Sequence, residues 1–145
     1  MLVFGRVYIA WKGMKVFMAG KLFGIGVGPG DPELLTVKAI NAIKQLDVII
    51  APKTEKKDGS VALNIASQYI KPETEIVYQV FPMTVGFAED DTAWQSNKQE
   101  ILELLQAGKN VGFLTLGDPM FYSTYIYVFR LLQHEAVEIE TIPGI

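Results

Sequence analysis

Four glycines lie close together in one loop near the start of the sequence, Gly24-Ile25-Gly26-Val27-Gly28-Pro29-Gly30-Asp31-Pro32. An apolar run at residues 22–27 leads into the loop and an amphipathic stretch at residues 33–45 follows it, which predicts a strand, a turn and a helix. Glycine permits positive φ and close approach of other groups, so the backbone amides of the loop stay accessible. The free N–H groups at the start of the helix point into the same space. The pattern favours binding of a small polar ligand, with a tight structural turn as the alternative.

A dinucleotide site is one form that such a ligand site could take. Those sites carry G-x-G-x-x-G at the turn and an acidic residue about 20 positions further on, which binds the ribose. Here the glycines run G-x-G-x-G-P-G, and the next expected strand, residues 47–51, ends at Ala51-Pro52-Lys53 without a carboxylate. The sequence therefore argues against classical NAD binding.

The composition is that of a globular domain: 145 residues, 50% of them hydrophobic and 20% charged. A net charge of −3 gives no support for nucleic-acid binding. The absence of cysteine excludes disulfides, thiolate metal sites and cysteine nucleophiles. The single histidine, His134, excludes a metal site built from histidines, and its place near the end of an expected helix suits the helix dipole. We expect no metal site.

The first 20 residues form an extension of unknown status, and the patterned domain covers residues 21–145. Met14 and Met18 are plausible alternative starts. The apolar run at residues 2–10 contains Arg6 and is too short to span a bilayer. We expect no membrane association and a cytoplasmic location.

Periodicity predicts the elements that position the glycine loop. Strands are expected at residues 22–27, 47–51, 75–81, 110–116 and 137–142. Helices are expected at residues 33–45, from a cap at Ser60 to residue 70, at 91–107 and at 120–134. Within the third helix, the expected buried residues are Trp94, Ile101, Leu104 and Leu105, and Gly108 is expected to end it. This alternation predicts an α/β fold: a five-stranded, mainly parallel sheet with helices on both faces.

Ligands of such sheets bind beyond the carboxyl ends of the strands. Three glycine turns are expected there. They are residues 26–31, Leu116-Gly117-Asp118-Pro119 and Pro143-Gly144-Ile145.

These turns resemble the motifs of the tetrapyrrole (corrin/porphyrin) methylase family. Residues 26–36, G-x-G-P-G-D-P-E-L-L-T, resemble its opening motif, and residues 116–123, L-G-D-P-x-x-Y-S, resemble its second. Ile142-Pro143-Gly144-Ile145 resembles the third, without the small hydroxyl residues that continue it. The run P-E-L-L-T-V-K-A and residues 53–63 look most like the precorrin-2 C-20 methyltransferases of cobalamin synthesis.

The resemblance implies a fold of two α/β domains with S-adenosylmethionine (SAM) bound in the cleft between them. This sequence would supply only the N-terminal domain, so we expect it to bind SAM poorly alone and to be inactive. The implied reaction is methyl transfer to C-20, a meso carbon, of precorrin-2 or cobalt-precorrin-2, and the sequence leaves the presence of cobalt open. The full-length protein would be a homodimer with a small tetrapyrrole as its substrate.

The resemblance also implies roles for particular residues. Pro29 would face the cleft. The methionine portion of SAM would contact Leu116, Gly117 and Asp118, and the next cofactor contacts would be Phe121, Ser123 and Thr124. Gly28, Asp31 and Lys53 are candidates for substrate binding. The sequence does not identify a catalytic residue or a general base. The sulfonium is a good leaving group, and the protein must chiefly hold the reactants in line.

Each of these roles has a structural alternative. Asp31 suits a helix cap better than a substrate contact. Asp118 and Pro119 could form the cap and first turn of the fourth helix. Ser123 and Thr124 could be ordinary surface or back-bonded residues.

Two groups of side chains are expected to be structural as well. The aromatic residues of the fourth helix suit the core better than a substrate platform; they are Tyr122, Tyr125, Tyr127 and Phe129. Lys53, Lys56 and Lys57 suit a solvated loop, although their place after the second strand would also let them meet substrate carboxylates.

Two other functions stay open on the sequence. One is a methylase of the same fold with a different substrate: uroporphyrinogen III, another precorrin, RNA or a translation factor. The other is a non-catalytic domain that binds a partner through its exposed surface.

Overall fold

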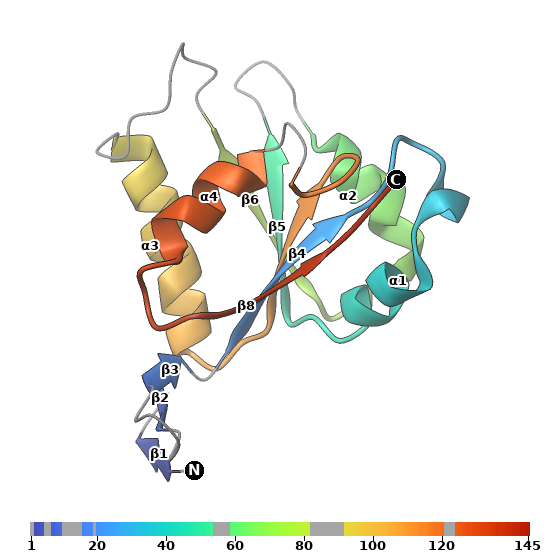
Figure 1. The fold of residues 1–145 in the computed structure, drawn as a ribbon. Coiled ribbons are helices and arrows are strands. Elements are labelled where there is room, and N and C mark those ends of the chain that lie inside the picture. The colour runs from blue at the N-terminus through green and yellow to red at the C-terminus, as the bar shows by residue number, and fades with distance from the viewer. Residues whose placement is uncertain are drawn as a thin grey trace.

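The fold is built on a five-stranded parallel sheet (Figure 1). The structure, a computed structural model, describes residues 20–53, 59–81, 92–120 and 124–145, together with the backbone of residues 2–4, 7–9 and 16–18. The strands of the sheet are β4 (Lys21–Gly26), β5 (Val48–Lys53), β6 (Glu75–Val80), β7 (Val111–Thr115) and β8 (Glu138–Ile142). Their order is β6-β5-β7-β4-β8, and every pairing is parallel. The predicted α/β class is confirmed.

Helices cover both faces of the sheet, which explains why its central strands are continuous apolar runs. Figure 1 shows α1 (Val37–Ile43) and α2 (Val61–Ala66) against one face, and α3 (Thr92–Gln106) and α4 (Thr124–Leu132) against the other. Successive residues of β7 pack on opposite faces of the sheet: Phe113 packs with α3 and α4, and Leu114 packs with α1 and α2. All five residues of β7 are buried.

The first helix begins later than the sequence suggests. A single helix over residues 33–45 is wrong, because the segment divides into a 3-10 helix, η2 (Pro32–Leu34), and α1. Leu35 separates the two with extended backbone (ψ 139°) and a buried side chain. The Thr36 hydroxyl then accepts a hydrogen bond from Ala39 N at 3.0 Å and caps α1.

The second helix is capped as predicted: Ser60 Oγ accepts a hydrogen bond from Leu63 N at 3.3 Å. It continues past α2 as the 3-10 helix η3 (Ser67–Tyr69).

On α3 the burial of Trp94, Ile101 and Leu105 is confirmed, but Leu102 is buried where Leu104 was expected and Leu104 is only partly buried. Gly108, at φ 83°, follows the end of this helix as predicted.

A small antiparallel sheet precedes β4, and α4 differs from its predicted bounds. Residues 2–4, 7–9 and 16–18 form antiparallel strands, β1 (Leu2–Phe4), β2 (Val7–Ile9) and β3 (Val16–Met18), which the sequence did not predict. They pair with one another and not with the main sheet. The described part of α4 begins at Thr124 rather than residue 120, and His134 lies two residues beyond its last residue. None of the described helices is both long and apolar enough for a membrane span.

Candidate functional site

The first two glycine turns are bonded to each other beyond the ends of their strands. β4 and β7 are neighbours, with Gly26 opposite Thr115. Val27 N then donates to Thr115 O at 2.9 Å. Gly28 and Gly117 exchange two backbone hydrogen bonds, at 3.3 Å from Gly28 N and 2.8 Å from Gly117 N. Both residues have positive φ, 78° and 68°, which favours glycine at each position.

The third turn packs directly on the other two. β8 is the other neighbour of β4, and it ends where Ile25 is opposite Ile142. A Cβ on Gly144 would overlap the carbonyl oxygen of Gly117 and lie 2.9 Å from the carbonyl carbon of Gly26. The prediction that three glycine turns meet at the carboxyl edge of the sheet is therefore confirmed. The strand order explains it, because the strands that precede the three turns are the adjacent trio β7-β4-β8.

Asp118 links the second turn to the third. Its Oδ1 accepts a hydrogen bond from Met120 N at 2.9 Å, and its Oδ2 accepts one from Gly144 N at 3.1 Å. The first bond closes a local turn at residues 118–120. The structural alternative expected a helix cap, but this bond does not cap the described part of α4, because that part begins at Thr124. The second joins residues 26 positions apart, and sequence reasoning missed it. In the sequence, the only signal for this bond was that both glycine turns were expected at the same edge of the sheet.

The rim of this site is exposed and partly apolar. Pro29 and Gly30 are exposed, as are Leu116 (51%), Met120 (50%) and Ile145 (69%). Gly117 and Asp118 are half-buried, and Thr124, at the start of α4, is also half-buried. Three further residues considered for this site lie outside the described residues; they are Phe121, Tyr122 and Ser123.

Asp31 caps the first turn. Its Oδ1 accepts a hydrogen bond from Glu33 N at 2.9 Å, so the capping role is confirmed, although the capped element is η2 and Thr36 caps α1. The Tyr69 hydroxyl donates to Pro32 O at 3.2 Å and ties η2 to the end of η3. The opening motif is therefore fixed by two hydrogen bonds, one within the motif to Asp31 and one from Tyr69 of η3.

Lys53 lies at the same edge of the sheet, but on β5, which β7 separates from β4. Its Nζ is 5.7 Å from the ring centroid of Tyr78 on β6, and the Tyr78 side chain is 48% exposed. Sequence reasoning missed Tyr78, because alternation marks it only as a strand residue. Lys56 and Lys57 lie outside the described residues.

The aromatic residues of α4 are largely structural, as expected. Tyr125 is fully buried, and its hydroxyl shares a hydrogen bond of 2.9 Å with Thr141 Oγ1 on β8. Burial raises the pKa of the Tyr125 hydroxyl, and the bond to Thr141 partly opposes that rise. Phe129 packs on the core, and Tyr127, 37% exposed, lies edge-on to Trp94 with ring centroids 5.6 Å apart.

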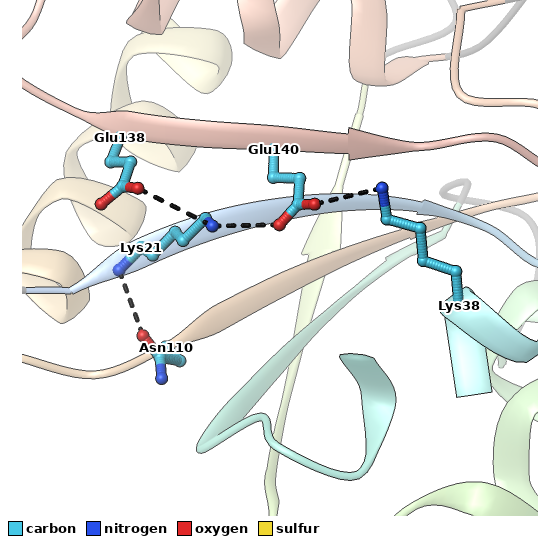
Figure 2. Close-up of polar contacts among 5 residues, drawn as sticks. All are labelled: Lys21, Lys38, Asn110, Glu138 and Glu140. Atoms are coloured by element: carbon cyan, nitrogen blue, oxygen red, sulfur yellow. Dashed lines mark hydrogen bonds and ion pairs between the residues drawn. The ribbon is translucent and has the colours of Figure 1, made fainter. Parts of the chain in front are cut away.

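A charged cluster binds the edge strand β8 to its neighbours (Figure 2). Lys21 Nζ lies 3.0 Å from Glu140 Oε2 and 3.7 Å from Glu138 Oε1. Lys38 Nζ, from α1, lies 3.3 Å from Glu140 Oε1. The hydrogen bond to Lys21 is the largest cause that lowers the pKa of Glu140, and the same bond raises the pKa of Lys21. Lys21 N also donates to Asn110 Oδ1 at 3.3 Å. The cluster links the side chains of β8 to those of β4 and α1.

Among the described residues, no group of three or more acidic or histidine side chains lies close enough together to hold a metal ion. The cluster around Glu140 is internally paired, and the glycine turns present mainly backbone.

Curated relatives match most of the chain. A cobalt-precorrin-2 C(20)-methyltransferase from Salmonella typhimurium is 39% identical over 129 residues, which are 88% of this chain and 54% of that protein. A precorrin-2 C(20)-methyltransferase from a Sinorhizobium species is 34% identical over 134 residues, with coverage of 87% and 54%. The chain spans about half the length of the curated relatives it matches.

Solved structures share the fold. A cobalt precorrin-4 methyltransferase matches with a TM-score of 0.65 at 31% identity, over 86% of this chain and 46% of that one. The uroporphyrin-III C-methyltransferase of Thermus thermophilus, complexed with S-adenyl homocysteine, matches with a TM-score of 0.63 at 25% identity, over 87% and 45%. Residues 21–145, which contain the sheet and all three glycine turns, match the family model described as Tetrapyrrole (Corrin/Porphyrin) Methylases. The chain therefore belongs to the tetrapyrrole methylase family.

Proposed function

We propose that this chain is the N-terminal α/β domain of a two-domain, SAM-dependent methyltransferase that methylates C-20 of precorrin-2 or cobalt-precorrin-2. The convergence of the three glycine turns at one edge of the sheet carries the proposal, because it assembles a backbone-rich site from the segments that resemble the family motifs. The identity to C(20)-methyltransferases supports this choice of substrate. The complete enzyme would be a homodimer.

The cofactor site would lie on the exposed rim of the turns. Members of the family use SAM, and the Thermus relative is complexed with S-adenyl homocysteine. Apolar Leu116 and Pro29 and the half-buried backbone of Gly117 suit the thioether and the polar groups of such a ligand. We assign cofactor contacts to these three residues and to Phe121, Ser123 and Thr124.

The chemistry requires little from titratable side chains. When bound, SAM supplies a methyl group carried on its sulfonium. The electron-rich carbon of the macrocycle accepts that methyl group as the methyl–sulfur bond breaks and the sulfonium becomes a thioether. The protein must hold carbon, methyl and sulfur in line, and positioning of that kind contributes roughly 7–11 kcal/mol to catalysis. Turns fixed by backbone bonds and glycine packing are suited to this task.

The substrate would extend from the turns toward β5 and β6. Precorrins carry many carboxylates, and Lys53 provides a half-buried cation on that side of the site. The exposed ring of Tyr78 beside it provides an aromatic surface. Gly28 and Asp31 are further candidates, although the Asp31 carboxylate already accepts a hydrogen bond from Glu33 N.

A second candidate is methylation of a different tetrapyrrole at the same site. The 31% identity to a solved cobalt precorrin-4 methyltransferase favours it over an RNA or protein substrate.

Titration of the ¹⁵N-labelled chain with SAM and with S-adenosylhomocysteine tests the cofactor assignment, because NMR detects weak binding. We expect the amides of Gly28, Gly117 and Thr124 to shift, and the amide of Thr74, at the opposite edge of the sheet, to stay in place. A chimera that adds the second half of the Salmonella relative after Ile145 then tests the substrate, with labelled methyl transfer to precorrin-2, cobalt-precorrin-2 and cobalt-precorrin-4. No binding by either protein would refute the cofactor assignment, and transfer only to cobalt-precorrin-4 would refute the substrate.

A further inference from the structure

Both oxygens of the Asp118 carboxylate face backbone N–H groups that belong to different turns. Oδ1 accepts from Met120 N at 2.9 Å and Oδ2 accepts from Gly144 N at 3.1 Å. Hydrogen bonds to a charged acceptor are roughly twice as strong as neutral ones, and two of them fix the direction of a carboxylate. The orientation of Asp118 is therefore set by the protein itself.

The bond to Gly144 holds the third turn at a crowded point. Gly144 lies so close to Gly117 and Gly26 that a Cβ would overlap the Gly117 carbonyl. Gly117 is in turn bonded to Gly28 in both directions. A displacement of the third turn would therefore open the packing that all three turns share.

We propose that Asp118 is a positioning residue, whose carboxylate fastens the third turn to the second and so shapes the cofactor site from behind. This inference rests on the proposed SAM site and revises the role of Asp118 within it. The carboxylate acts through the backbone of Gly144 and does not serve as the counter-charge of the sulfonium.

Two ligands separate these roles, because SAM carries a positive sulfonium and S-adenosylhomocysteine carries a neutral thioether. A counter-charge discriminates between them, since its loss weakens only the binding of the cation. A positioning residue does not discriminate, since a displaced turn harms the fit of both ligands equally.

The experiment measures both dissociation constants by NMR titration for the wild-type chain, Asp118→Ala and Asp118→Asn. We expect Asp118→Ala to weaken both ligands by the same factor, about tenfold, because two charge-assisted bonds are lost. Asp118→Asn should weaken both by about threefold, because its amide retains one acceptor oxygen. Hydrogen exchange at Gly144 N, measured without ligand, should be fastest in Asp118→Ala, slower in Asp118→Asn and slowest in the wild-type chain.

Thr74→Ala provides a matched control for lost stability. The Thr74 hydroxyl donates to Leu46 O at 3.1 Å in a buried position before β6, at the edge of the sheet opposite to the turns. Its loss should lower the melting temperature without changing either dissociation constant or the exchange at Gly144. If Asp118 only stabilised the fold, Asp118→Ala would lower the melting temperature and leave both dissociation constants and the exchange at Gly144 unchanged, as expected for Thr74→Ala.

Three results would overturn the proposal. Loss of SAM affinity alone in Asp118→Asn would make the carboxylate a direct electrostatic contact. Unchanged exchange at Gly144 in Asp118→Ala would show that the bond does not hold the turn. Unchanged affinities with accelerated exchange would show that the turn does not shape the site. If the wild-type chain and the chimera bind neither ligand, the SAM assignment fails and takes the cofactor role of Asp118 with it, whereas the exchange at Gly144 still reports the bond.

Discussion

Gly28 and Gly117 are paired through their backbones in both directions, although they extend two strands that run parallel. The bridge is antiparallel, and both glycines adopt positive φ, so the two chains leave their parallel strands in opposite directions at this point. The parallel strands β4 and β7 are thus joined, beyond their ends, by two backbone hydrogen bonds between the turns that follow them. These bonds bring the backbones of the first two glycine turns together.

Gly144→Ala should destabilise the protein by about 2–4 kcal/mol, because its Cβ would overlap the Gly117 carbonyl and press on Gly26. Chemical denaturation measures the change. Gly59→Ala is the matched control, because a Cβ there meets no atom within 4 Å, and its effect should stay within about 0.5 kcal/mol. Equal effects of the two substitutions would show that Gly144 is not packed against Gly117 and Gly26.

Tyr125→Phe should lower the free energy of unfolding by about 1 kcal/mol, since it removes the hydrogen bond with Thr141 and leaves the ring in the core. Thr141→Val removes the same bond from the other side. The double variant should lose less than the sum of the single losses, with a coupling of about 0.5 kcal/mol or more. Strict additivity in urea denaturation would show that the two hydroxyls do not interact.

Glu140→Gln should remove part of the pH dependence of stability. The folded-state pKa of Glu140 lies below its ordinary value of 4.5, chiefly through the bond to Lys21 and then the bond to Lys38. Its contribution is therefore full above pH 4.5 and is lost as the pH falls through the lowered pKa. Because these groups are partly exposed, we expect about 0.5–1 kcal/mol at neutral pH and low salt.

Urea denaturation of both proteins across this pH range measures the difference. The opposite sign applies to Lys21, whose raised pKa keeps its contribution below pH 10.5 and loses it as the pH rises through the folded value. Glu138, the other carboxylate facing Lys21, remains in Glu140→Gln and retains part of this alkaline effect. A stability difference that does not change below pH 4.5 would contradict the assignment to Glu140.

Lys53→Gln should weaken binding of a polycarboxylate porphyrin such as uroporphyrin and leave the affinity for S-adenosylhomocysteine unchanged. Porphyrin absorbance at two salt concentrations measures the effect, which we expect to be about threefold to tenfold at low salt and smaller at high salt. Lys44→Gln is the control, because Lys44 is exposed and follows α1 just before the amino end of β5, whereas Lys53 lies at the carboxyl end of that strand. An equal loss in both variants would point to nonspecific attraction.

The sequence predicted the existence and type of the main-sheet elements because the buried strands are continuous apolar runs between glycine and proline signals. It could not predict that β4 pairs with both β7 and β8, because periodicity describes one segment at a time. The start of α1 was wrong because two capping side chains, Asp31 and Thr36, compete within one motif. Tertiary packing of Leu35 favours a break between them.

At the site, the meeting of the turns followed from the rule that parallel strands share a carboxyl edge. The bond from Gly144 to Asp118 did not, since it depends on the order of strands and on a side-chain direction. Tyr78 was missed for a similar reason: only the placement of β6 beside β5 brings its ring near Lys53.

The pairing of β4 with β8 joins the ends of the domain in sequence, with Lys21 opposite Glu138, more than a hundred residues further along. Among the pairings of the main sheet, this one closes the longest loop and so carries the highest entropic cost of loop closure. During synthesis, β4 and β7 emerge well before β8, so one edge of β4 stays unpaired until the last strand arrives. The third turn follows that strand, so the three glycine turns meet only in chains that have completed the most distant pairing of the sheet. Binding of SAM at the proposed site would therefore also report that this pairing has formed.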